Sequence, residues 1–293
     1  MSAHHQAVRT FYRQTDWMFR VLGWIRGSQA MHAGLWQQAR SHRAALRSID
    51  ETLLATVNLK PGECLLDAGC GAGASANRIA ASHQGPVIGI TIVPEQAKRA
   101  RRAGHAQFLC ADYAAAPLRS GCCDVVWMLE SICHAPDKPA LLTEIVRLLR
   151  PGGRLIVADR FAARSNLTPA ERHQLRTWLR PWAMPDLLTA DELVVLAERA
   201  GLQLRQRNDL TLSAGPSLRF LGHFAQLTLP AALILHAMRL QSDLQIAAMR
   251  ACVAQTRTLN AGLWRYYLLL FEKPAPESER YRLVSRMSIL EKQ

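Results

Sequence analysis

The sequence lacks the features of a disulfide-stapled, membrane-spanning or repeat protein. Its 293 residues contain seven cysteines, an odd number, and no C-x-x-C pair. Its longest nearly uncharged apolar stretch, QLTLPAALILHAM, is shorter than the roughly 18 residues that cross a bilayer and contains Pro230. There is no signal-like apolar segment at the start, no internal repeat and no low-complexity tract. We therefore expect a cytoplasmic globular protein with free thiols and no membrane span.

Acidic residues are also few. The 36 basic residues outnumber 23 acidic ones, which gives a formal net charge of +13. Such a balance attracts phosphates, nucleic acid or acidic membrane surfaces without choosing among them. The densest basic run, KRARR at 98–102, has no interleaved aromatic residues on which the bases of a single-stranded nucleic acid could stack. The pattern therefore predicts a solvated helix face. We expect no nucleic-acid partner, keep peripheral contact with a membrane open, and leave the oligomeric state undecided.

Short apolar runs alternate with helical patterns through the middle of the chain. The runs are CLLDA, VIGIT, AQFLCAD, DVVWML and RLIVADRF. Helical patterns start near Ala74, Pro94, Lys138 and Ala190. This alternation is typical of βαβ units, in which helices cover both faces of a parallel sheet. The sequence therefore predicts an α/β fold with a doubly wound sheet.

The rest of the chain divides around that core. Residues 1–57 look helical, with a break around RGSQAMHAG, and we expect them to form a lid. The main domain would occupy residues 58–273, with helical cap insertions near 161–190 and 213–262 and a closing strand at WRYYLLLFEKP. The last residues, 274–293, are expected to be a loosely held tail.

Three alternate glycines lie in the predicted loop between the first strand and the helix that follows it. In LLDAGCGAGASANRIA the strand would end at Asp67, and Gly69, Gly71 and Gly73 would precede a helix from about Ala74. Glycines let a ligand approach bare backbone amides at a helix N-terminus, and doubly wound folds bind ligands at the carboxyl ends of their strands. Ordinary connections use such turns too, and the spacing differs from the dinucleotide G-x-G-x-x-G. The loop alone indicates a ligand site without naming the ligand.

The stretch LLDAGCGAGA resembles the first motif of the class I S-adenosylmethionine-dependent methyltransferases. Four later segments resemble that family's further motifs, in the same order: GITIVPEQAKRA, FLCADYAAAPL, DVVWMLESICHAPDK and LLRPGGRLIVADRF. Together the five segments cover roughly residues 60–160. The resemblance implies the Rossmann-like fold of that class and S-adenosyl-L-methionine as the cofactor.

A narrower resemblance concerns the acceptor. FYRQTDWMFRVLGWIRGSQAMHAGLW, ESICHAPDK and QTRTLNAGLWRYYLLLFEKP are similar to the subgroup that contains sterol, tocopherol and prenyl-diphosphate C-methyltransferases. This implies a small hydrophobic acceptor, and C-methylation of a prenyl diphosphate such as farnesyl diphosphate, a step of terpene biosynthesis, is our leading expectation. Sterol or tocopherol-like C-methylation and O- or N-methylation of a natural product remain as alternatives.

The resemblance also assigns the cofactor residues. Asp67 and the glycine loop would hold the methionine end, with Asp67 accepting a hydrogen bond from the ammonium group, and Asp112 would accept one from the adenine amine. Most class I enzymes end the second strand with an acidic residue that binds the ribose, but this chain has Thr91 there. We expect Gln96 to help hold the ribose. The alternative for Asp112 is a turn or helix cap.

Two residues after the fourth strand are candidates for catalysis. Glu130 would remove the proton from the carbocation that methylation of an alkene carbon leaves. His134 would relay that proton or bind an anionic group. The alternatives are a structural carboxylate paired with an arginine for Glu130, and a loop cap before Pro136 for His134.

Aromatic residues are candidates for the acceptor pocket, because their faces stabilise cations. Tyr12, Trp17 and Trp127 are the ones that we place there. Aromatic residues at helical spacing also occur as plain core, so packing is the alternative for each of them.

A diphosphate head would need two or more arginines or lysines. Arg160 and Arg176 are our candidates, and Arg172 and Arg180 share the spacing of four along the same segment. Solvated helix charges are the alternative. The sequence contains no D-D-x-x-D motif, so Mg²⁺ would be carried by the diphosphate substrate and not by a protein site.

Overall fold

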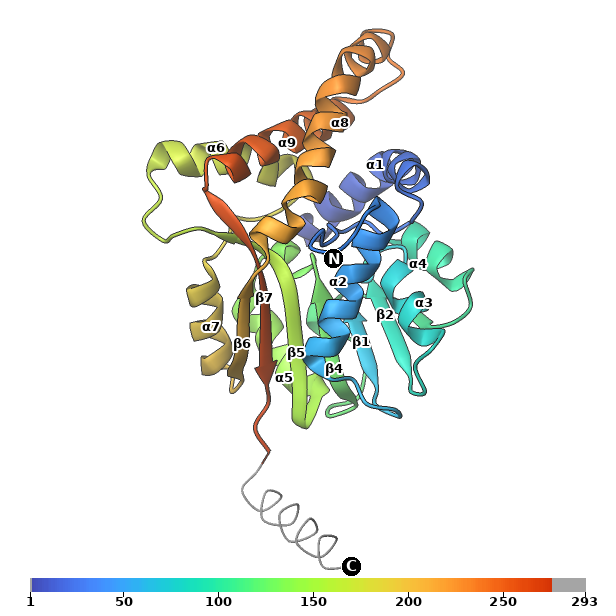
Figure 1. Ribbon diagram of the computed structural model, residues 1–293, viewed down its shortest axis with the longest axis vertical. Coiled ribbons are helices and arrows are strands. Elements are labelled where there is room, and N and C mark those ends of the chain that lie inside the picture. Colours follow the sequence, from blue (N-terminus) through green and yellow to red (C-terminus); the bar gives the residue numbers. More distant parts are fainter. Residues whose placement is uncertain (1, 276–293) are drawn as a thin grey trace, which may run out of the picture.

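A seven-stranded sheet forms the centre of the computed structural model, which describes residues 2–275 (Figure 1). The strand order is β3-β2-β1-β4-β5-β7-β6. The strands are β1 (Leu65–Ala68), β2 (Val87–Thr91), β3 (Gln107–Cys110), β4 (Cys123–Leu129), β5 (Leu149–Ala162), β6 (Gln203–Asp209) and β7 (Trp264–Glu272).

The helices are α1 (Ala3–Arg26), α2 (His42–Val57), α3 (Ala74–Ala80), α4 (Pro94–Arg101), α5 (Lys138–Leu148), α6 (Pro169–Leu179), α7 (Ala190–Arg199), α8 (Thr211–Ala237) and α9 (Asp243–Asn260). Three short 3₁₀ helices lie at Tyr113–Ala115, Ile132–His134 and Arg180–Trp182. The helices expected from Ala74, Pro94, Lys138 and Ala190 begin at those residues.

The doubly wound α/β fold is confirmed, with one correction to the sheet. It is mixed and not purely parallel, because β7 runs antiparallel to both β5 and β6. Strand β6, with the sequence QLRQRND, was not expected. It lies at the sheet edge and most of its residues are exposed, so it lacks the apolar pattern that identifies the central strands.

Helices cover both faces of the sheet. Neighbouring strand residues point to opposite faces, so Trp127 packs in the core under α2 and α3, with Leu53 and Ala76, while Val126 packs in the core under α5 and α7, with Leu142. The segment expected as a lid divides into two parts. Helix α1 lies above the carboxyl ends of the parallel strands, whereas α2 belongs to the helix layer on one face of the sheet (Figure 1).

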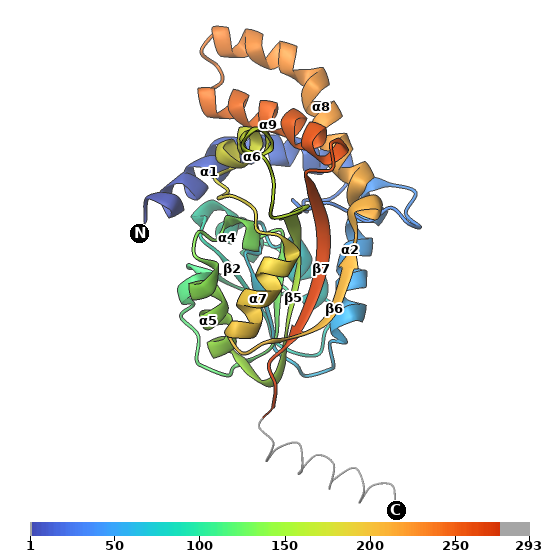
Figure 2. The same cartoon turned by 90° about the vertical axis from the view of Figure 1, so that its left-hand side faces the viewer.

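The cap consists of α1, α6, α8 and α9, above the carboxyl ends of the parallel strands (Figures 1 and 2). Helices α8 and α9 pack closely where Gly222 faces Thr256, since a Cβ on this glycine would lie 2.0 Å from the threonine Oγ1. The predicted tail, apart from residues 274 and 275, lies outside the described residues.

Helix α8 corrects the expectation that no segment is long enough to span a membrane. Within residues 2–275 it is the one helix whose length and composition would allow it, with 27 residues and a mean hydropathy of 1.4 in its most apolar window. The stretch QLTLPAALILHAM covers only part of this helix, which continues through both Pro216 and Pro230. Only 22% of that window is buried inside the protein.

Candidate active site

A cavity of about 390 Å³ opens between the carboxyl edge of the sheet and the cap. Its walls come from the loops after β1, β2, β3 and β4 on one side and from α1, α8 and α9 on the other. Ligands of doubly wound folds bind at this edge. The cavity therefore brings the predicted cofactor loop and the predicted catalytic residues to one place.

The glycine loop forms the floor of the cavity at the end of β1. Gly69 has φ +97°, and a Cβ there would lie 2.4 Å from the Ser131 Cβ, so both the backbone conformation and the space favour glycine. Gly71 also has positive φ and lines the cavity. Gly73 does not line it: the space that its Cβ would need is taken by Ala100 and Phe108. Its role is thus close packing of α3 against its neighbours.

Asp67 tests whether the cavity fits the expected cofactor. Its carboxylate is 4% exposed and lines the cavity, and no hydrogen-bond partner for it occurs among residues 2–275. Burial, together with the charge of Asp50, raises the pKa of Asp67 to about 8. A buried carboxylate without a partner, beside bare glycine amides, fits the ammonium group of S-adenosylmethionine. Asp67 and the glycine loop would hold that end of the cofactor.

The residues expected to contact the ribose and adenine also line the cavity. The Thr91 hydroxyl donates to Gln96 Oε1 at 2.9 Å, so it orients the amide. Asp112 accepts a hydrogen bond from the Ala114 N–H at 2.8 Å and pairs with His5 Nε2 at 3.2 Å. Asp112 therefore caps the 3₁₀ turn that follows it and still faces the cavity.

Glu130 stands at the end of β4 in an unusual backbone conformation, with φ +51°. Its Oε1 accepts hydrogen bonds from the Ala33 N–H at 2.7 Å and the Tyr266 hydroxyl at 3.0 Å. Its Oε2 accepts one from the Arg160 guanidinium at 2.6 Å. Such conformations in residues other than glycine persist where their surroundings hold them, often at functional sites.

The hydrogen bonds of Glu130 set its charge. We call the part of the cavity around Glu130 the acceptor side. Burial alone would raise the pKa of Glu130, but Arg160 and the Ala33 N–H outweigh it and hold the pKa below its usual value. Next to it, Asp159 accepts hydrogen bonds from the backbone N–H groups of Cys133 and Arg160. Burial raises the pKa of Asp159 to about 6, against the opposing pull of Arg160. Glu130 is thus ionised at neutral pH.

His134 and Tyr12 form a second polar group in the cavity. Burial lowers the pKa of His134 to about 4, so the imidazole is neutral at pH 7. Its Nδ1 lies 3.4 Å from the Ala183 carbonyl oxygen, which only accepts, so this nitrogen carries the proton. Nε2 then accepts from the Tyr12 hydroxyl at 3.0 Å. Burial also raises the pKa of Tyr12 above its usual value.

The structure separates the residues assigned to the acceptor into two sets. Tyr12, Trp127 and Arg160 line the cavity. Trp17 does not: its side chain is 42% exposed on the outer face of α1. Arg176 is also outside, on α6, where it forms an exposed ion pair with Asp186. The assignment of these two residues to the acceptor pocket is therefore not supported, because helical spacing alone does not say which face of a helix turns inward.

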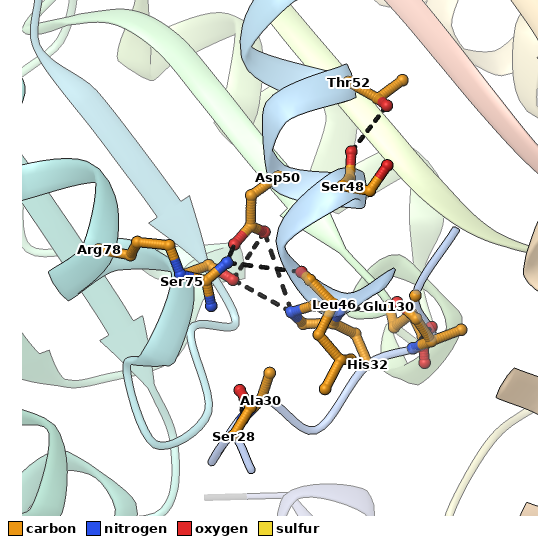
Figure 3. Close-up of polar contacts among 12 residues, drawn as sticks. Ser28, Ala30, His32, Leu46, Ser48, Asp50, Thr52, Ser75, Arg78 and Glu130 are labelled. Carbon is orange, nitrogen blue, oxygen red and sulfur yellow. Dashed lines mark hydrogen bonds and ion pairs between the residues drawn. The ribbon is translucent and has the colours of Figure 1, made fainter. Parts of the chain in front are cut away.

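Residues that sequence reasoning missed hold the segment between α1 and α2 in place (Figure 3). His32 Nε2 lies 3.2 Å from the Ser75 hydroxyl, which donates to Asp50 Oδ1 at 2.9 Å. Arg78 pairs with the other oxygen of Asp50. This network positions the neighbouring Ala33 N–H at Glu130. Its one sequence signal is an aspartate on the apolar stripe of α2, where Ile49 and Leu53 are buried.

Comparison with known proteins identifies the class. The methyltransferase domain family matches residues 66–157. An O-methyltransferase of Pyrenophora dematioidea is 30% identical over 191 residues, which are 61% of this chain and 70% of that protein. The chain therefore belongs to the S-adenosylmethionine-dependent methyltransferases, as the glycine loop and its motifs predicted.

Other relatives include methyltransferases of hydrophobic compounds. The 24-methylenesterol C-methyltransferase 2 of Oryza sativa subsp. japonica is 32% identical over 215 residues, 70% of this chain and 58% of that protein. The chloroplastic tocopherol O-methyltransferase of Arabidopsis thaliana is 31% identical over 226 residues, 69% of this chain and 64% of that protein. The chain thus spans less than two thirds of the length of these two relatives.

Solved structures share the whole fold. The cyclopropane synthase MmaA2 of Mycobacterium tuberculosis has a TM-score of 0.78 at 17% identity, over 93% of this chain and 99% of that one. The geranyl diphosphate C-methyltransferase of Streptomyces coelicolor A3(2) has a TM-score of 0.72 at 17% identity, over 93% and 98%. The [4+2]-cyclase SpnF has a TM-score of 0.74 at 24% identity, over 92% and 96%. The cap as well as the sheet is therefore common to this fold.

Proposed function

We propose that this chain transfers a methyl group from S-adenosylmethionine to an alkene carbon of a small isoprenoid acceptor. The relatives that act on sterols and tocopherols, and the fold shared with geranyl diphosphate C-methyltransferase, support this class of acceptor. The apolar cavity under the cap supports it as well.

The state of Glu130 is the observation that carries the proposal. The bound cofactor would supply an electrophilic methyl group, and its addition to an alkene leaves a carbocation on the acceptor. A hydrogen next to such a cation is very acidic, so a weak base suffices to remove it. The ionised Glu130 carboxylate, with its lowered pKa, is such a base. It would be a poor base for an alcohol or a phenol.

Aromatic side chains from α1 would stabilise the cation. The Tyr12 ring packs against Phe11 and Phe19, with ring centroids at 5.0 and 6.0 Å, and all three rings line the cavity with Trp127. Aromatic faces attract cations most strongly where water is excluded. These residues would also keep water away from the cation until the proton has left.

The head group of the acceptor is less well matched to a diphosphate. Of the described lining residues, Arg160 is the single arginine or lysine, and Glu130 and Asp159 already neutralise it. His4 and His5 add two imidazoles at the N-terminal end of α1. We therefore extend the proposal to acceptors with an uncharged head, beside farnesyl diphosphate. Magnesium brought by a diphosphate stays a prediction.

O-methylation is the second candidate, and the Tyr12–His134 pair favours it. The Tyr12 hydroxyl donates a hydrogen bond to His134 Nε2, so an acceptor hydroxyl that donates to the Tyr12 oxygen would be joined to the imidazole through two hydrogen bonds. This candidate uses the same cofactor site and differs in the atom that is methylated.

The test is an incubation with methyl-labelled S-adenosylmethionine and a panel of acceptors. The panel contains geranyl and farnesyl diphosphates, farnesol as the uncharged match of the latter, a sterol and a tocopherol-like phenol. Label is counted in the organic extract after phosphatase treatment, and NMR locates the new methyl group. We expect a carbon-bound methyl group on at least one isoprenoid.

The outcomes separate the candidates. An oxygen-bound methyl group would favour the Tyr12–His134 route over ours. No label with any acceptor, while the protein still binds S-adenosylhomocysteine, would refute the isoprenoid class and leave the cofactor site intact. Label on farnesol but not on farnesyl diphosphate would assign an uncharged head group.

A further inference from the structure

The second half of α8 is an apolar surface that nothing in the described chain covers. Leu227 and Ile234 are 80% and 64% exposed, and Met238 and Leu240 beyond the helix end are exposed to a similar extent. In Figures 1 and 2 this part of α8 stands at the far end of the cap, away from the sheet. Apolar residues clustered on one protrusion mark an interaction site more often than scattered ones do.

Helix α1 carries a second exposed stripe. Trp17, Val21 and Trp24 recur at intervals of three or four residues, Arg13 and Arg20 keep the same spacing to Trp17, and all five are exposed, Trp24 to 81%. Residues at this spacing lie on one helix face. A helix face of tryptophan and arginine is typical of helices that lie in the boundary between lipid head groups and acyl chains.

The two surfaces border the same contact. Met18 of α1 packs against a small cluster that contains Ala232 of α8 and Met249 of α9. Gln14 accepts at its side-chain oxygen from the Ser242 hydroxyl at 2.7 Å, at the start of α9. The α8–α9 turn is thus held on α1, beside the stripe of Trp17 and Val21. We call the exposed apolar residues of this stripe and of the second half of α8 the apolar tip. The arginines of the stripe border it.

Basic residues outnumber acidic ones around the apolar tip. Segments 3–26 and 211–260, which make up α1, α8, α9 and their turn, contain eight arginines and two acidic residues. Of the two, Asp16 is paired with Arg99, and Asp243 lies near His236 at 3.4 Å. Arginines beside an apolar surface complement acidic lipid head groups. They would oppose association of this surface with a second copy of itself.

Helix α8 is placed to lie on a bilayer and not to cross it. Its first half is tied to the protein, since Ser213, Ser217, Leu218 and Gly222 are buried. The part from about 226 to 240 carries the exposed apolar side chains, packs on α1 and α9 at Ala232, and is shorter than the roughly 20 residues that a spanning helix needs. A short apolar element beside basic residues inserts into one leaflet.

We infer that the apolar tip docks on the surface of a bilayer that contains anionic lipid. The inner faces of the same helices line the cavity, at Phe19 of α1 and Leu221 of α8. Docking there would place the wall of the cavity at the lipid surface, where hydrophobic acceptors dissolve. The inference does not depend on which atom of the acceptor is methylated.

Co-sedimentation with vesicles tests the inference. The full chain is mixed with vesicles of phosphatidylcholine alone or with one part in four of phosphatidylglycerol. We expect binding to the mixed vesicles, weaker by about tenfold or more on the neutral ones and in high salt. Tryptophan emission should shift to shorter wavelength on binding, because Trp24 leaves water.

Two variants and a matched control locate the contact. I234S/W24S removes apolar contacts and R13Q/R20Q removes charge, and each should weaken vesicle binding by about tenfold or more. Leu212, 88% exposed at the start of α8, is outside the apolar tip; Leu212→Ser should bind vesicles as the parent does. None of these residues lines the cavity. Binding of S-adenosylhomocysteine reports that each variant is folded.

Several outcomes would overturn the inference. Failure of the parent to bind mixed vesicles would do so, as would equal binding by I234S/W24S and the parent. A dimer in light scattering that I234S/W24S dissociates, with no vesicle binding, would assign the apolar tip to a second copy of the chain instead.

Discussion

The cofactor side and the acceptor side of the cavity each bury one carboxylate at a strand end, and they treat it in opposite ways. Asp67, near the end of β1 and before Gly69, has no partner among the described residues, and burial raises its pKa to about 8. Glu130, after β4, is bound by Arg160, Tyr266 and the Ala33 N–H, and its pKa is lowered. One site is complete without a ligand, and the other is not.

This difference bears on what each site does. A buried carboxylate without a partner costs free energy, and a positive ligand group at Asp67 would relieve that cost on binding. At Glu130 the compensating charge is part of the protein, so the carboxylate stays ionised whatever the cavity holds. The first arrangement suits binding of an ammonium group. The second suits a base that must be ready when a cation forms.

The largest expected effect comes from removing the carboxylate on the acceptor side of the cavity. Glu130→Gln should lower kcat by about a hundredfold or more, because the proton acceptor is lost. The affinity for S-adenosylhomocysteine should stay within a few fold. The change also removes the hydrogen-bonded counter-charge of buried Arg160 and leaves it only Asp159 at 3.7 Å, which should lower the free energy of unfolding by about 3 kcal/mol. Steady-state kinetics and chemical denaturation measure the two effects.

A charge-paired control separates stability from catalysis. The double variant E130Q/R160Q removes both charges and leaves Asp159 held by the backbone N–H groups of Cys133 and Arg160, so its stability should recover in part while its turnover should not. Recovery of turnover together with stability would mean that Glu130 is only a structural partner of Arg160.

The next largest effect concerns the cofactor side. Asp67→Asn should weaken binding of S-adenosylhomocysteine by about ten- to a hundredfold, the usual worth of a charge-assisted hydrogen bond. In the parent the carboxyl is mostly protonated at pH 7, because its pKa is raised to about 8, and binding of an ammonium group ionises it. Calorimetry in buffers of different ionisation enthalpy should therefore detect release of most of one proton at pH 7, and little above pH 9.

Asp191 offers the control, because its side chain is 78% exposed and pairs with Arg207 far from the cavity. Asp191→Asn should change neither the affinity nor the proton release.

The raised pKa of Asp67 also means that the folded chain holds this proton between about pH 4 and 8, so its contribution to stability falls as pH rises through that window. Unchanged proton release in Asp67→Asn would contradict the assignment of Asp67 as the partner of the cofactor's ammonium group.

The cofactor side is the part that the sequence predicted best. Positive φ at Gly69 and Gly71, the end of the strand at Ala68, one residue beyond the predicted Asp67, and the helix start at Ala74 are all properties of neighbouring residues, so a local pattern records them. The acidic edge residue Asp112 also follows from local order. Close packing at Gly73 was not distinguishable from ligand contact, because both require the absence of a side chain.

The acceptor side was less predictable, because its contacts join distant segments. Ala33 and Tyr266 reach Glu130 across 97 and 136 positions of the chain. No local pattern pairs them. Trp17 and Arg176 were assigned to the cavity from residue type, and only packing decides which face of a helix turns inward. Strand β6 was missed for a related reason, since an exposed edge strand keeps no apolar alternation.

The smallest expected effect concerns the Tyr12–His134 pair, which tests whether the acceptor side uses one base or two. Tyr12→Phe removes one hydrogen bond to a neutral imidazole, so C-methylation should fall only by about three- to tenfold. The pKa of His134 is lowered to about 4, so at saturating S-adenosylmethionine a titration of His134 should add no acid limb near pH 6.5 to kcat/KM for the acceptor. The unfolded chain binds this proton between about pH 6.5 and 4 and the folded chain does not, so stability falls as pH falls through that window. His134→Gln should remove this part of the acid loss, which denaturation at pH 7 and pH 5 measures. A loss of a hundredfold in Tyr12→Phe would instead assign proton removal to this pair, as O-methylation requires.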